Sequence, residues 1–246
     1  PPCYRTSLSD SLLYLTAFMS PTVAMLGYNR AGLAIYEWLL EQHDVDVLGL
    51  FTTTDQLETI SSLELDFIVS AGYNHRIPEH IIDHPDIACI NVHPSYLPYN
   101  RGKDPNVWSI AEGTPAGVSI HLVEPDFDTG PVIAQMQVKT DFADTGLDLH
   151  QRLEDAQLEC FKQAWPEIRS GEFDADPQRE TDATAHTRGD LHDLCHLHPD
   201  DQYTIKELLD ILRALTHPHY ENAHIEVDGE TYYLEVSIRQ ADKEAD

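Results

Sequence analysis

Residues 90–133 read INVHPSYLPYNRGKDPNVWSIAEGTPAGVSIHLVEPDFDTGPVI, which is two apolar runs separated by a polar loop. The first run ends on Asn91 and His93, and side chains two residues apart in a strand point to the same face of a sheet. The second run, 117–123, leads into an acidic turn at 126–130. Open α/β sheets bind ligands where polar groups meet at the carboxyl ends of strands. This segment therefore predicts buried strands with a polar site at their ends.

The sequence before this segment predicts the other half of an α/β sheet. A strand at 22–26, a helix at about 31–43 and a strand at 45–51 form a βαβ unit, typical of mononucleotide-binding folds. We expect a Rossmann-like, mostly parallel twisted sheet with an antiparallel edge. The remaining expected elements are strands at 66–70 and 131–138, the second antiparallel to 117–123, and a closing helix at 145–169.

The C-terminal part predicts a small helix and β-hairpin region. A helix is expected at 204–215, and Asp228-Gly229 between alternating runs is typical of a hairpin turn. The charged, His-rich stretch before it reads as a loop without a clean ligand quartet, so no metal is expected. Its candidate ligands are His186, His192, Cys195, His196 and His198. The expected parts are an extension at 1–20 with a helix at 9–18, a catalytic domain at 21–170, a linker at 171–183 and a subdomain at 184–246.

The order of polar residues in the central segment resembles that of the formyltransferases that use 10-formyltetrahydrofolate. Their shared pattern is Asn-x-His at a strand end, then Ser-x-Leu-Pro, Arg-Gly, a Trp and an Asp before Thr-Gly. The matching residues are Asn91, His93, Ser95, Leu97, Pro98, Arg101, Gly102, Trp108 and Asp128. The loop at 95–108 is most similar to the branch of the family that formylates amino groups on nucleotide-linked sugars.

The resemblance implies acyl transfer from a folate nitrogen to an amine, during which negative charge gathers on the formyl oxygen. Hydrogen-bond donors aimed at such an oxygen usually do most of the catalytic work. We expect Asn91 and a protonated His93 to be these donors. Asp128 is expected to keep His93 charged, or to accept the proton that the amine loses. Neither a metal nor a covalent enzyme intermediate is required.

The resemblance also implies which residues bind the folate and the nucleotide sugar. The loop after 66–70 and the acidic turn are expected to hold the pterin, largely through backbone groups. The folate candidates are Tyr73, Arg76, Ile77, Asp126 and Phe127. The sugar-nucleotide candidates are Ser95, Tyr96, Asn100, Arg101, Lys103 and Asn106. Arg101 and Lys103 are suited to a diphosphate, since guanidinium groups form paired bonds with phosphate oxygens.

Three other functions stay open at this point. A methionyl-tRNA formyltransferase needs a basic tRNA-binding domain, whereas the tail here is acidic. A glycinamide ribonucleotide formyltransferase lacks the tail helix and hairpin. A non-catalytic relative would bind only folate or a nucleotide, and the joint presence of Asn91, His93 and Asp128 argues against that reading.

Composition and charge restrict the partners of the protein. Its 43 acidic and 15 basic residues give a formal charge of −28 over 246 residues, which argues against binding nucleic acid or anionic membranes. The four scattered cysteines indicate a reducing compartment, and no segment approaches the roughly 20 apolar residues that span a bilayer. We therefore expect a cytoplasmic protein, with a homodimer contact through the tail left open.

The acidic excess is either an ordinary solvated surface or an adaptation to a salty cytoplasm. Under the second hypothesis, molar KCl screens the repulsion between carboxylates and raises the melting temperature. Thermal melts followed by circular dichroism at about 0.1 M and about 2 M KCl test this. A melting temperature that fails to rise with KCl would leave the ordinary solvated surface as the explanation.

Overall fold

The protein is built on one six-stranded mixed sheet, in a computed structural model that describes residues 20–218, 220 and 222–241. The strand order is β2-β1-β3-β4-β6-β7. The first four of these strands run parallel, whereas β6 is antiparallel to both β4 and β7. The expected mostly parallel sheet with an antiparallel edge is therefore confirmed. The strands are β1 (Thr22–Leu26), β2 (Asp46–Phe51), β3 (Phe67–Ser70), β4 (Ala88–His93), β6 (Gly117–Leu122) and β7 (Val132–Gln137).

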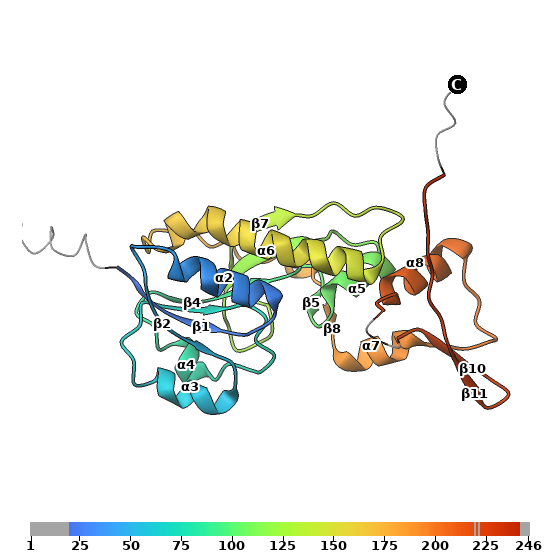
Figure 1. The fold of residues 1–246 in the computed structure, drawn as a ribbon, viewed down its shortest axis with the longest axis horizontal. Helices are drawn as coiled ribbons and strands as arrows, with labels where there is room; N and C mark the ends of the chain where they lie inside the picture. The colour runs from blue at the N-terminus through green and yellow to red at the C-terminus, as the bar shows by residue number, and fades with distance from the viewer. Residues whose placement is uncertain (1–19, 219, 221, 242–246) are drawn as a thin grey trace, which may run out of the picture.

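Helices cover both faces of this sheet (Figure 1). On one face lie α2 (Arg30–Leu40) and α6 (Gly146–Ile168), and on the other lie α3 (Thr54–Ile60) and α4 (Glu79–Ile82). Local sequence fixes where these helices begin: capping boxes start α3 and α6, and the Asn29 side chain accepts the Gly32 N–H at 2.8 Å. No helix among the described residues has the length and apolar character needed to cross a membrane.

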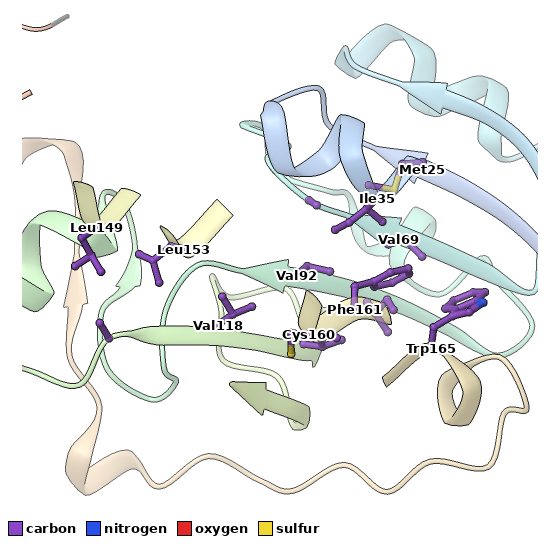
Figure 2. Packing of buried hydrophobic residues seen from close by; sticks show 14 of the residues in the cluster. Met25, Ile35, Val69, Val92, Val118, Leu149, Leu153, Cys160, Phe161 and Trp165 are labelled. Carbon is purple, nitrogen blue, oxygen red and sulfur yellow. The ribbon is translucent and has the colours of Figure 1, made fainter. Parts of the chain in front are cut away.

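The main hydrophobic core lies between the sheet and α6. Phe161 and Trp165 of α6 are fully or almost fully buried and stack on each other, with ring centroids 5.2 Å apart. Figure 2 shows both rings lying against the strands that carry Val69 and Val92. A second cluster fills the space under α3 and α4. Side chains of β4 contribute to both hydrophobic clusters, because successive side chains of a strand point to opposite faces of the sheet.

The C-terminal part packs against the end of the sheet domain through α5 (Pro105–Ala111), which is buried almost throughout. It contains α7 (Arg188–Cys195), α8 (Ile205–Leu215), β9 (His196–Leu197) and the hairpin of β10 (His224–Val227) and β11 (Glu230–Tyr233). The expected hairpin is confirmed: Asp228 and Gly229 have φ of 53° and 82°, as its two-residue turn requires. The loop expected around residues 188–195 is wrong, since a Thr187–Asp190 capping box begins a helix there.

The segment expected to be a linker, 171–183, touches the catalytic part of the chain. Asp176 forms a β-bridge with Val132, and just beyond the segment β8 (Ala185–His186) pairs in parallel with β5 (Arg101–Gly102). The division of the chain at these boundaries stays a prediction. The helix expected at 9–18 lies outside the described residues.

Loss of the Phe161 ring should strongly destabilise the fold. Phe161→Ala leaves a cavity between α6 and the sheet, and we expect the free energy of unfolding to fall by about 3 to 5 kcal/mol. Phe142→Ala is the matched control, because that ring is 53% exposed. Urea unfolding followed by circular dichroism at one fixed salt concentration measures both. Equal losses for the two variants would contradict this description of the core.

Candidate active site

The carboxyl end of β4 carries the first two polar groups of the site. Ile90 and Val92 belong to the core under α6, whereas Cys89 belongs to the opposite cluster. The alternation of the strand therefore places Asn91 and His93 on the face opposite α6. His93 is 6% exposed. An amide and an imidazole thus project from one strand end, side by side.

Asp128 approaches these two groups from the acidic turn after β6. One carboxylate oxygen accepts a hydrogen bond from the Asn91 amide at 3.3 Å, and the other lies 3.6 Å from Nε2 of His93. The Gly102 N–H donates to the second oxygen at 2.9 Å. Asp128 itself has a φ of 56°, in the left-handed region that L-residues adopt at an energetic cost. The turn is therefore held in an unusual shape that aims its carboxylate at β4.

His121 is a further member of this cluster that the sequence reasoning missed. It lies directly opposite Asn91 in the β4–β6 register, and its Nε2 is 3.2 Å from the Asn91 amide nitrogen and 3.5 Å from Asp128. Its Nδ1 lies 2.7 Å from the Leu122 carbonyl oxygen. A proton on Nδ1 satisfies that carbonyl and leaves Nε2 to accept from Asn91. Strand register is the signal that could have identified His121 from the sequence. Antiparallel pairing of 117–123 with β4 places this imidazole beside the Asn91 amide.

The positive charge expected on His93 is not favoured in the free protein. Burial lowers the pKa of His93 below its ordinary value of 6.5, and this outweighs the opposite effect of the Asp128 carboxylate. The imidazole is therefore neutral at pH 7. Its Nε2 also lies 3.4 Å from the Asn100 carbonyl oxygen. A neutral buried imidazole is suited to accept a proton during a reaction.

Asp128 has the opposite protonation behaviour, although it is also buried. Burial alone would raise its pKa, but the rings of His93 and His121 and the Gly102 N–H outweigh burial and hold the pKa well below its usual range. Asp128 is therefore ionised at neutral pH. The cluster combines a fixed negative charge with a neutral imidazole next to it.

The folate candidates lie on the two loops that flank the cluster. Arg76 joins these loops, because it donates to the Pro125 carbonyl oxygen at 3.1 Å. Tyr73 packs in the second hydrophobic cluster, and burial raises the pKa of its hydroxyl. Ile77 is 9% exposed, whereas the ring of Phe127 is 66% exposed and Asp126 is also at the surface. The structure thus places these candidates around one end of the sheet.

The sugar-nucleotide candidates divide into buried and accessible groups. Asn100 is fully buried and donates to Ser109 and Thr114, and the Asn106 amide donates to the Gly146 carbonyl oxygen. Arg101 is 7% exposed, and its guanidinium binds Gln178 and Glu180. The side chains of Asn100 and Arg101 and the amide nitrogen of Asn106 are therefore occupied inside the protein.

The other three candidates are Ser95, Tyr96 and Lys103. The Ser95 hydroxyl is buried, and its carbonyl oxygen accepts from Ser119. Tyr96 is half-buried and lies close to Gly117. Lys103 is partly exposed, and its Nζ lies 3.4 Å from the side-chain oxygen of Asn74. Lys103 is thus the cation of this group that is not bound to an acidic side chain.

The fold separates part of the His-rich stretch, although the rings of His196 and His198 stay together, with centroids 4.4 Å apart. His186 lies on β8 and stacks on Trp108 at 3.8 Å between ring centroids, while His192 and Cys195 belong to α7. Within residues 20–218, 220 and 222–241, no group of three or more His, Cys, Asp or Glu side chains is arranged to hold a metal ion.

A Rossmann-like sheet with an amide, an imidazole and a carboxylate at its carboxyl edge is the arrangement expected of a folate-dependent formyl-transfer enzyme. Comparison with protein families agrees, because the formyl transferase model matches residues 41–165. The N-formyltransferase dimerization C-terminal domain matches residues 190–240. The chain belongs to the formyl transferase family and is a formyltransferase.

Curated relatives and solved structures place it among sugar-modifying members. The dTDP-4-amino-4,6-dideoxyglucose formyltransferase of Mycobacterium bovis is 32% identical over 174 residues, 70% of this chain and 73% of that protein. A solved protein structure from Mycobacterium tuberculosis is 28% identical with a TM-score of 0.81, covering 91% of this chain and 100% of that one. The formyltransferase PseJ of Anoxybacillus kamchatkensis is 34% identical with a TM-score of 0.61, covering 69% and 87%. The last structure contains a UDP-linked 4-formamido sugar and tetrahydrofolate.

The protonation of His93 can be measured without any substrate. In the wild type, histidine ring chemical shifts followed by NMR should give His93 a pKa below 6.5. In Asp128→Asn the pKa should fall further, because the carboxylate that favours the imidazolium is gone. Asp126→Asn, in the same turn but at the surface, is the matched control and should change little. An upward shift in Asp128→Asn would refute the assigned electrostatics.

Proposed function

We propose that this enzyme moves the formyl group of 10-formyltetrahydrofolate to the amine of a nucleotide-linked amino deoxysugar. The observation that carries the proposal is the convergence of Asn91 and His93, from the end of β4, on the carboxylate of Asp128 in the acidic turn, at 3.3 Å and 3.6 Å. Both named relatives above 30% identity act on, or contain, a sugar nucleotide substituted at position 4. We therefore place the acceptor amine at position 4 of a dideoxysugar.

The protonation states of the cluster support a specific path for the proton. The neutral amine attacks the formyl carbon and becomes positively charged as the new C–N bond forms. Neutral His93 accepts this proton, directly or through one water. The imidazolium that results is stabilised by Asp128 and donates toward the negatively charged formyl oxygen. It then returns the proton to the folate nitrogen as the bond from that nitrogen to the formyl carbon breaks.

Asn91 is the second donor in this proposal. In the free protein its two N–H groups are directed at Asp128 and at His121. It can therefore donate to the formyl oxygen only by exchanging one of these bonds. The energetic cost is small if the bond to His121 is the one exchanged, because the carboxylate of Asp128 then stays paired.

The residues around the cluster fit a pterin. Within the described part of the chain, the buried hydroxyl of Tyr73 has no hydrogen-bond partner, and a buried polar atom of this kind is suited to a ligand group. The exposed ring of Phe127 offers a stacking surface, and Ile77 adds an apolar wall. These residues would bind and orient the folate, which supplies the activated formyl group.

The sugar nucleotide would be held by the loop at 94–105. Lys103 is suited to its diphosphate as a point charge, and Tyr96 to the sugar or base. We assign Arg101, Asn100 and Asn106 a supporting part only, because the guanidinium of Arg101 and the amide nitrogens of both Asn side chains donate to protein partners. Ser95 is different, because within the described residues its buried hydroxyl has no hydrogen-bond partner, and it braces the loop beside β4 only through its carbonyl oxygen.

Assembly and location complete the proposal. A homodimer through residues 190–240 is supported by the description of the domain that matches there. The hairpin also presents Tyr232 and Tyr233, which are 54% and 53% exposed. Cys89, Cys160 and Cys195 are free thiols, which supports a reducing, cytoplasmic environment. The sugar-nucleotide relatives favour this acceptor over methionyl-tRNA or glycinamide ribonucleotide.

A panel of acceptors tests the function. The protein is incubated with 10-formyltetrahydrofolate and dTDP- or UDP-linked 4-amino and 3-amino dideoxysugars, and mass spectrometry follows the gain of one formyl group. We expect formylation of a 4-amino sugar. Asp128→Asn should lower kcat by about 10²- to 10⁴-fold, whereas Asp83→Asn, an exposed carboxylate elsewhere, should not. An Asp128→Asn variant as fast as the wild type would overturn the mechanism, and wild type inert on every sugar would overturn the substrate.

A further inference from the structure

The segment at 176–186 lies across both loops that form the active site. Its Asp176 bridges to Val132, and its last two residues pair with Arg101 and Gly102 of β5. Between these two attachments, the Gln178 side chain reaches the acidic turn. We refer to residues 176–186 as the brace. It comes from the end of the chain that follows α6, about fifty positions after the turn it contacts.

Gln178 uses every hydrogen-bonding group of its amide. Its nitrogen donates to the carbonyl oxygens of Asp128 at 2.8 Å and Gly130 at 2.7 Å. Its oxygen accepts from Nε and Nη2 of Arg101 at 3.0 Å and 2.9 Å. Arg101 in turn pairs with both oxygens of Glu180. The amide therefore connects the acidic turn to the loop after β4, the two segments whose side chains meet in the active site.

The carbonyl that Gln178 binds belongs to the residue whose carboxylate organises the site. Asp128 has the left-handed φ of 56°, which is an unfavourable backbone conformation for an L-residue. Two donated bonds on either side of Thr129 hold the turn in this shape. If they are lost, the turn is free to relax toward ordinary φ values, and the carboxylate moves away from His93.

We infer that Gln178 is a positioning residue for formyl transfer, acting on Asp128 through the backbone of the acidic turn. The expected effect on kcat rests on the proposed function. The hydrogen-bond geometry of Gln178, from which its role is inferred, does not depend on that function. A change of about 1 Å at a catalytic group is enough to lower a rate by about hundredfold. Gln178 thus affects kcat without touching either substrate.

Two substitutions separate this role from simple support of Arg101. Gln178→Met keeps the size of the side chain and removes both donors and the acceptor. Gln178→Glu keeps an acceptor for Arg101, with added charge, but faces two carbonyl oxygens with a carboxylate. If donation to the turn is what matters, Gln178→Glu should be at least as impaired as Gln178→Met. If holding Arg101 is what matters, Gln178→Glu should be the milder change.

The kinetic test measures kcat and KM for the sugar nucleotide that the wild type formylates. We expect kcat to fall about ten- to hundredfold in Gln178→Met, with a smaller change in KM, and to fall as much or more in Gln178→Glu. Gln163→Met and Gln163→Glu, on the exposed side of α6, are matched controls that should keep wild-type rates. Wild-type kcat in Gln178→Met, or a milder Gln178→Glu, would overturn the inference.

A second measurement needs no substrate and so stands apart from the proposed function. In Gln178→Met, NMR titration should give His93 a lower pKa than in the wild type, because the Asp128 carboxylate has moved away. Thermal melts show whether the variant is still folded. A folded Gln178→Met protein with an unchanged His93 pKa would refute the positioning role even if no sugar substrate had been found.

Discussion

The burial of one carboxylate is the constraint around which this structure is arranged. An ionised Asp128 removed from water is costly unless its oxygens receive hydrogen bonds and nearby positive or polarised groups. The Gly102 N–H and the Asn91 amide supply the bonds, and two imidazoles stand within 3.6 Å. Asn91 and His93 come from β4, His121 from β6 and Gly102 from β5 in the loop after β4. The carboxylate can stay charged only if β4, β6 and the two loops are assembled correctly.

The same carboxylate explains why the protonation state of His93 can change during the reaction, although the imidazole is neutral in the free protein. Burial disfavours the imidazolium, and Asp128 opposes that effect without overcoming it. A change of charge beside the imidazole can therefore alter which protonation state is favoured. A negative charge developing on a bound carbonyl oxygen adds to that of Asp128 and favours the imidazolium. On the other face of β4, Ile90 and Val92 anchor the strand in the main hydrophobic core.

Much of the fold and part of the site could be predicted from the sequence. Side chains two residues apart in a strand share a face, which places Asn91 and His93 together. The residue pattern of the resembling family adds Asp128 to them. His121 and Gln178 were missed for a physical reason: each reaches the site through a long-range register or contact that no local pattern encodes. Arg101 illustrates the converse, since a cation on a loop suits phosphate by its chemistry, yet the carboxylate of Glu180 already binds it. The charged composition of 188–195 also led to a wrong prediction of a loop, because a capping box begins a helix there.

The brace has a consequence for how such enzymes can be recombined. The family model that recognises this protein as a formyltransferase ends at residue 165, and the dimerization domain begins at residue 190. Gln178 lies between them, in a stretch that neither match covers. A chimera could join the catalytic part of one relative, ending at the boundary of the family match, to the tail of another. Such a chimera would replace Gln178 together with the tail. Both parts of the chimera could fold while its kcat was low. The junction between the two relatives should therefore lie after β8.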